Sequence, residues 1–149
     1  MTASNHVVTG ALIGAIVPVP VVAIPLALAS HLVLDASPHF GSKNMTLTDT
    51  KFMAILGTDI FVSLMILSAV YIARPTNWIL MLVCAVVSAS PDLVWLPYWI
   101  KELRGKNFKR SRLAHFLGWI QWGERPWGWL VEIGYFVAII YFLRSYLMV

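Results

Sequence analysis

The chain has 149 residues, of which 59% are hydrophobic and only 12% are charged, and its formal net charge is +4. Soluble domains carry about 25% charged residues, so this composition excludes an ordinary soluble globular domain and indicates a membrane protein. The N-terminal stretch "MTASNHVVTG" has neither a basic region nor a small-residue cleavage site. We therefore expect no removable signal peptide.

Hydrophobic zones long enough to cross about 30 Å of hydrocarbon, which takes about 20 helical residues, occur four times. They are residues 7–34, 52–73, 78–99 and 127–147. The first zone contains Pro18 and Pro20, and proline removes a backbone donor and disfavours helix in the residue before it. We expect a helical hairpin there, with helices near 7–17 and 21–36; a single kinked span is the alternative. The sequence thus predicts an all-α polytopic membrane protein, a single domain over 1–149, with three further transmembrane helices.

The first zone also carries a pair of glycines at a spacing of four, Gly10 and Gly14 in "GALIG". Small residues at this spacing allow two helix backbones to approach closely in a membrane. The pair predicts close packing of the first helix against a neighbour.

Basic residues gather in the segment 101–125, which we expect to be amphipathic and interfacial. It holds seven of the eleven Lys and Arg residues, whereas the turn "RPTN" between the second and third zones holds one. The positive-inside rule places this segment in the cytoplasm, together with the loop 37–51 and the N-terminus of a hairpin. Six of the seven tryptophans lie between Trp95 and Trp129, which is typical of an interfacial belt on an anionic leaflet.

Membrane lipids with anionic headgroups are therefore the expected partners of the basic segment. Basic residues beside aromatics also occur in nucleic-acid-binding proteins, but the adjoining spans hold this segment against lipid. We expect no nucleic-acid partner. The sequence leaves a homo-oligomer open.

Ionisable side chains inside apolar zones are costly unless they have a partner, so they point to function or to a buried polar network. On the topology above they converge near the cytoplasmic face of the membrane. Within the zones or at their ends lie His31, Asp35, Asp59, Asp92 and Glu132, with His6, His39 and His115 just outside. Asp59 either pairs with a donor from the first or fourth zone or belongs to a site.

The segment "HLVLD" places His31 and Asp35 on one helical face, where side chains four residues apart lie about 5–6 Å from each other. They either clasp a metal ion or form a hydrogen-bonded pair that joins two helices. Pro38 ends this helix and turns His39 back toward the same place. Imidazole and carboxylate ligands suit zinc, and also manganese or iron.

A carboxylate that is not needed as a ligand can act as a general base toward water. Asp92 and Glu132 are the candidates, and Glu132 lies so far into the fourth zone that it needs a partner. Asp92 follows Ser90 and Pro91, so its alternative role is that of a first-turn acid in a helix that these two residues start.

A resemblance supports the same residues. "MTASNH", "SHLVLD" and "SPDL" resemble motifs of the bacterial inner-membrane family of membrane-bound, metal-dependent hydrolases. That family shows an N-terminal histidine, a Leu-Pro-Asp motif, a histidine-rich segment and a His-x-x-x-Asp motif. Here His-x-x-x-Asp precedes Pro-Asp, and the Thr-His-Ser core of the histidine-rich segment is missing. The resemblance implies site roles for His6, His31, Asp35, Asp92 and His115, and a bacterial inner (plasma) membrane location.

We therefore predict a membrane-embedded, metal-dependent hydrolase that acts at the cytoplasmic interface on a lipid or phosphoester. In this hypothesis His31, Asp35 and His115 bind a divalent metal, first of all zinc, together with His6 or His39. Asp92 ligates or activates water, and Glu132 is the second candidate base. The alternative is a non-enzymatic membrane protein whose buried His and Asp groups form a structural polar network or an ion or proton site. Enzymatic activity itself stays open.

Overall fold

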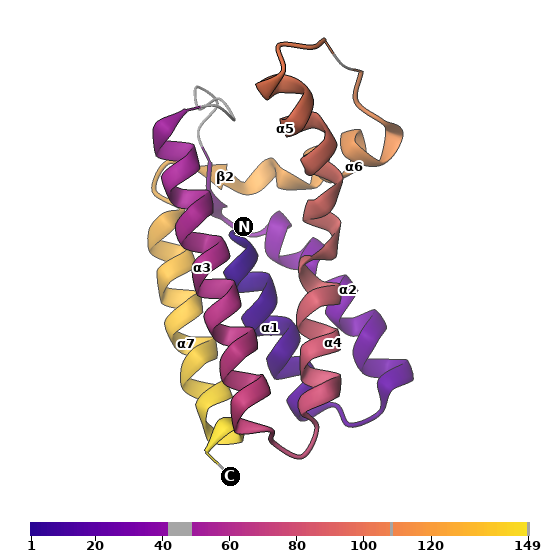
Figure 1. The fold of residues 1–149 in the computed structure, drawn as a ribbon, viewed down its shortest axis with the longest axis vertical. Coiled ribbons are helices and arrows are strands. Elements are labelled where there is room, and N and C mark those ends of the chain that lie inside the picture. Colours follow the sequence, from indigo (N-terminus) through magenta and orange to yellow (C-terminus); the bar gives the residue numbers. More distant parts are fainter. Residues whose placement is uncertain (42–48, 108, 149) are drawn as a thin grey trace.

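The computed structural model describes residues 1–41, 49–107 and 109–148, and these are almost entirely helical (Figure 1). The elements in chain order are α1 (Ala3–Ile16), α2 (Pro20–Ala36), β1 (His39–Phe40), α3 (Thr50–Ala73), α4 (Trp78–Ala89), the 3₁₀ helix η1 (Ser90–Trp95), α5 (Leu96–Leu103), α6 (Arg112–Ile120), the 3₁₀ helix η2 (Gln121–Gly123), β2 (Glu124–Arg125) and α7 (Trp129–Leu147). The all-α prediction is confirmed.

The described residues contain three helices that are long and apolar enough to cross a membrane. The first is α3, the second is the continuous stretch Trp78–Leu103 that α4, η1 and α5 form, and the third is α7. Only 11%, 22% and 11% of their most apolar windows are buried inside the protein. Their remaining apolar surface is therefore left for lipid, as expected of an integral membrane protein.

The first hydrophobic zone is a hairpin and not a single kinked span. The chain leaves the helical conformation at residues 17–19, and Pro20 occupies the first position of α2, where its missing N–H has no helical partner to lose. With 14 and 17 residues, α1 and α2 are about 21 and 26 Å long at about 1.5 Å per residue. Both are shorter than the hydrocarbon core of a bilayer.

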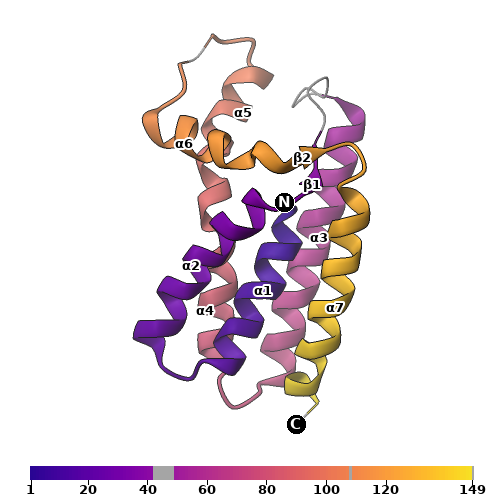
Figure 2. The ribbon, with the colours of Figure 1, turned by 180° about the vertical axis from the view of Figure 1, so that it is seen from behind.

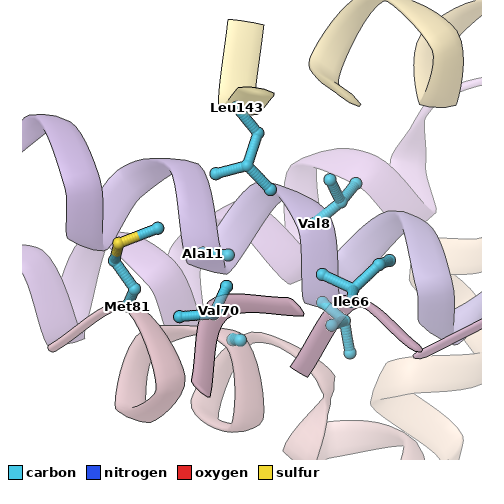
Figure 3. Packing of buried hydrophobic residues seen from close by; sticks show 8 residues of the cluster. Val8, Ala11, Ile66, Val70, Met81 and Leu143 are labelled. Atoms are coloured by element: carbon cyan, nitrogen blue, oxygen red, sulfur yellow. The ribbon is translucent and has the colours of Figure 1, made fainter. Parts of the chain in front are cut away.

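Helix α1 lies at the centre of the bundle and packs on α2, α3, α4 and α7. Its residues Val7, Val8 and Ala11 form the main hydrophobic cluster with side chains from three other helices (Figure 3). Those side chains are Ile66, Val70, Met81, Ala85 and Leu143. The central helix also carries four buried polar residues, which are Ser4, Asn5, His6 and Thr9. The four helices around α1 therefore shield these polar groups.

The predicted glycine pair lies at the contact between α1 and α4. A Cβ atom on Gly10 would lie 2.3 Å from the carbonyl oxygen of Cys84, and one on Gly14 would lie 2.7 Å from that of Leu80. Both neighbours are backbone atoms, which cannot rotate away as a side chain can. The two glycines thus let α1 lie directly against α4, as the spacing predicted.

The ends of the elements segregate as the span count predicted. The N-terminus, the end of α2 and the start of α3 lie toward one end of the bundle, and the C-terminus and the turn between α3 and α4 lie at the other (Figures 1 and 2). The side of the membrane that each end faces stays a prediction.

Residues 111–128, which we call the strap, cross the bundle at the end where α2 finishes (Figure 2). The strap comprises α6, η2, β2 and the turn before α7, and it packs on α2 through α6 and η2. Strands β1 and β2 pair in parallel, with His39 opposite Glu124. Gly123 lies against the carbonyl group of Ser37, and Gly128 lies against that of His39. This pairing fixes the strap over the end of the α1–α2 hairpin.

Candidate metal centre

Two histidines and two aspartates from three elements meet below the strap. They are His6 from α1, His31 and Asp35 from α2, and Asp92 from η1, and one ligand atom from each lies within 4.8 Å of all the others. We call these four residues the metal group. His6, His31 and Asp35 are buried, whereas the side chain of Asp92 is 28% exposed. The arrangement could hold a metal ion and leaves one of its four members accessible.

Asp35 lies at the middle of the group because each of its oxygens faces a different imidazole. Its Oδ1 lies 3.1 Å from His6 Nε2, and its Oδ2 lies 3.2 Å from His31 Nε2. The amino group of Met1 also donates to Oδ1, at 2.6 Å. Asp35 therefore already interacts with one cation and with both rings.

Hydrogen bonding orients the ring of His31 in the way that metal-binding histidines are usually oriented. Its Nδ1 lies 2.9 Å from the carbonyl oxygen of Ser88, to which it donates. In a neutral ring Nε2 then carries a lone pair, and it faces Asp35 at 3.2 Å and Asp92 at 3.9 Å. An outer hydrogen bond of this kind fixes the tautomer of a ligand. The lone pair on Nε2 of a neutral ring thus faces two carboxylates, and either a proton on Nε2 or a bound cation would satisfy this arrangement.

The ring of His6 is held by packing. It stacks on the ring of His31 with the centroids 4.1 Å apart, and its Nδ1 has no hydrogen-bond partner among the described residues. Because Nε2 already faces Asp35, the ring presents one nitrogen to the metal group and leaves the other in the helix interface.

A proline inside a continuous helical stretch places Asp92. The sequence allowed Ser90 and Pro91 to start a new helix, with Ser90 as its cap and Asp92 in its first turn. The 3₁₀ helix η1 does begin there and has Asp92 in its first turn, but Ser90 does not cap it. The Ser90 hydroxyl donates back to the carbonyl of Val87, and the backbone continues from α4 through η1 into α5. Proline lacks the N–H that an α-helix needs at this point, and the stretch tightens into a 3₁₀ helix. Asp92 lies in that tightened turn.

Asp59, in the span α3, holds the first turn of α1. Its Oδ2 accepts a hydrogen bond from the backbone N–H of Ala3 at 2.7 Å, and its Oδ1 accepts one from that of Ser4 at 2.8 Å. Thr2, the residue before the helix, provides no side-chain cap. A carboxylate from another helix thus satisfies two N–H groups that the start of a helix leaves free. The donors Ala3 and Ser4 lie just before the first zone, so Asp59 pairs with the helix that carries this zone and fixes the turn before His6.

We expect Asp59→Asn to weaken metal binding by the group about 10- to 100-fold, the range typical of residues that position ligands. Asparagine has one carbonyl oxygen and cannot accept from both N–H groups, so the first turn of α1 loosens. Competition with a chromophoric chelator measures the affinity. Asp49→Asn is the matched control, because Asp49 caps the first turn of α3 through Lys51 N. Equal affinities for the two variants would contradict a positioning role for Asp59.

Three residues predicted for the site lie elsewhere. His39 is buried, but its Nδ1 bonds to the carbonyl of Ser37, because the chain turns into β1 and away from the group. His115 is exposed on α6, since Ala114, Leu117 and Ile120 form the buried face of that helix. Glu132 is buried and its Oε1 accepts from the backbone N–H of Phe40. Phe40 lies in β1, whose pairing with β2 holds the strap, so Glu132 supports that pairing. Metal binding by His39 or His115 and a role of Glu132 as base therefore have no geometric support.

Two contributors to the site were not predicted. Gln121, from η2, donates through Nε2 to Asp35 Oδ2 at 3.2 Å, and the backbone carbonyl of Ser88 orients His31. Gln121 lies in a tryptophan-rich segment with no motif around it, and a carbonyl group leaves no trace in a sequence. A lone amide beside tryptophans is the one weak sequence signal that could have indicated Gln121.

No protein-family model matches the chain, and neither a curated protein nor a solved structure matches it. The four residues of the metal group lie in the segments "MTASNH", "SHLVLD" and "SPDL", whereas His115 is not in the group. The function is therefore argued from the chemistry of the group.

The donor set consists of two imidazoles and two carboxylates. Neutral imidazole and carboxylate suit divalent zinc, manganese and iron, and the two negative charges match one divalent ion. In a tetrahedral zinc site with bonds of about 2 Å the ligand atoms lie roughly 3.3 Å apart. Two contacts to different oxygens of Asp35, at 3.1 and 3.2 Å, are close to that separation, and His31 Nε2 lies 3.9 Å from Asp92 Oδ1.

Proposed function

We propose that this chain is a metal-dependent hydrolase embedded in the membrane, which acts at the cytoplasmic interface on an amphipathic ester or phosphoester. The observation that carries the proposal is the Nε2 atom of His31. It faces two carboxylates, while its other nitrogen is committed to the carbonyl of Ser88. A divalent ion, first of all zinc, would satisfy these facing acceptors.

His6, His31 and Asp35 would hold the ion, and Asp92 would either complete its ligands or act as base. When bound, such an ion supplies Lewis-acid chemistry that polarises an ester or phosphoester and activates water. Asp35 keeps both imidazoles in place, and Gln121 and Ser88 fix the orientation of Asp35 and His31. These residues are positioned before any substrate arrives, which favours catalysis.

Asp92 is the candidate for proton transfer because it is the accessible member of the group. Its side chain is 28% exposed, compared with 1% and 2% for His31 and Asp35. A carboxylate at the open edge of the group can accept a proton from water beside a bound substrate. A purely structural network would gain nothing from an accessible member, so this exposure favours the enzymatic reading over a structural polar network.

Hydrolysis by protein reconstituted in lipid vesicles tests the proposal. We expect protein stripped with a chelator to be inactive toward p-nitrophenyl phosphodiesters, p-nitrophenyl esters and fluorescent phospholipids. Reloading with zinc, manganese or iron should restore turnover of at least one substrate. His31→Ala should remain inactive after reloading, and His115→Ala, which changes a histidine outside the group, should keep its activity.

A different outcome separates the two functions. If the wild-type protein binds a metal and gains thermal stability but hydrolyses no member of the panel, the group is a structural ion site. That result would overturn the hydrolase and establish the non-enzymatic alternative.

A further inference from the structure

The strap has two apolar faces, although only one of them is covered by protein. Toward the bundle it buries Ala114, Leu117 and Ile120. On the outside, Leu113 and Phe116 are 54% and 49% exposed. The next outward side chains, Trp119 and Trp122, are 72% and 68% exposed. Because the outer face of this helix is also apolar, it needs an apolar surrounding on that side in addition to the bundle.

The position of the strap in the fold indicates what that surrounding is. It crosses the bundle where α7 begins and toward the end at which α3 starts, while α5, the last part of the second span, continues past it (Figure 2). Tryptophan is enriched where a span meets the headgroup layer, because its ring is apolar and its N–H is polar. The outer row of the strap therefore lies at the depth of lipid headgroups.

Charge selects the type of lipid. The exposed basic residues Arg112 and Arg125 lie toward the two ends of the strap, and the loop before it adds Lys106, Lys109 and Arg110. Within the strap the acidic residue is Glu124. Each basic residue near a membrane surface is attracted to the negative charge of an anionic leaflet. A neutral leaflet attracts these residues much less strongly.

We propose that the strap is an interfacial element whose outer row, Leu113, Phe116, Trp119 and Trp122, is inserted among the headgroups of an anionic leaflet. Its inner side covers the metal group. Gln121, which lies between Trp119 and Trp122 in the sequence, donates a hydrogen bond to Asp35. The bilayer thus covers the one face of the strap that the protein leaves open. This inference stands on the exposure and charge of the strap and does not depend on hydrolase activity.

Site-specific fluorescence in vesicles tests the insertion. The chain has one cysteine, Cys84, which is buried. In a Cys84→Ala background, Trp119→Cys carries an environment-sensitive probe, and Lys106→Cys carries the same probe as the matched control in the neighbouring loop. The vesicles contain phosphatidylcholine alone or mixed with phosphatidylglycerol, and lipids brominated near the headgroup serve as quenchers.

We expect the probe at position 119 to emit at shorter wavelength and to be quenched at least several-fold more than the probe at 106. Quenching at 119 should be stronger with phosphatidylglycerol, and Arg110→Gln combined with Arg112→Gln should reduce that difference. The proposal would be overturned if the probe at 119 emitted at the wavelength typical of the probe in water. It would also be overturned if a second copy of the chain shielded this probe from the lipid quenchers. Quenching that ignores phosphatidylglycerol would overturn the choice of an anionic leaflet.

Discussion

Asp35→Asn should remove the bound metal almost completely while leaving the helices folded. Asparagine keeps the size of the side chain but loses the charge and one of the two oxygens that face His6 and His31. Loss of an anionic ligand from the middle of the group should lower affinity by more than about 100-fold, because even residues that only position ligands change it 10- to 100-fold. Mass spectrometry of metal per purified chain measures the effect.

The folding control for this variant is built into the chain. Asp49→Asn makes the same chemical change in an aspartate that caps α3 through Lys51 N and is not part of the metal group. We expect Asp49→Asn to keep wild-type metal content, and circular dichroism should show equal helix content for both variants. Metal content that is unchanged by Asp35→Asn would refute the assignment of the group.

Gly10→Ala should produce the largest loss of stability of any single methyl addition in α1. The new Cβ would lie 2.3 Å from the carbonyl oxygen of Cys84 and 2.7 Å from Cα of Ala85. Backbone atoms of α4 must then move, and overpacking of this kind costs about 1–3 kcal/mol and sometimes more. Because His6 lies one turn before Gly10, displacement of α1 should also weaken the metal group. Thermal unfolding in detergent, followed by circular dichroism, measures the loss.

Gly57→Ala and Gly134→Ala are the matched controls. Both glycines lie inside helices that face lipid, and a Cβ at either position would meet no atom within 4 Å. Alanine in a helix interior is favoured over glycine by about 0.5–1 kcal/mol. We expect both controls to be neutral or slightly more stable, and an equal destabilisation by all three variants would contradict close packing of α1 on α4.

Much of the fold could be predicted because membrane chemistry constrains it strongly. The apolar zones 52–73 and 127–147 match α3 and α7 to within two residues at each end, since backbone groups in lipid have to bond within a helix. The break near Pro18 could be predicted because proline lacks a backbone N–H, and the close packing of Gly10 because glycine has no side chain. Each of these signals comes from residues close together in the sequence, whereas the partner of Gly10, which is Cys84 in α4, was not predicted.

The site was harder to predict because it depends on contacts between distant residues. His31 and Asp35 could be paired, since one helical turn joins them. His39 and Glu132, by contrast, satisfy backbone groups around the pairing of β1 with β2, which no spacing foretells. Gln121 reaches Asp35 across 86 residues. The predicted depth in the membrane correctly indicated which residues lie near one another. It could not indicate the direction of each side chain, which decides whether two residues are in contact.

The burial of α1 has a consequence for how the protein is made. This helix precedes in the chain all the helices that cover it, and its Asn5, His6 and Thr9 would be costly against lipid. The hairpin therefore has no favourable place in the bilayer until α3, α4 and finally α7 have been inserted. Biogenesis should thus keep the hairpin near water or the insertion machinery, and the metal group should form only once η1, which supplies Asp92, has joined α1 and α2.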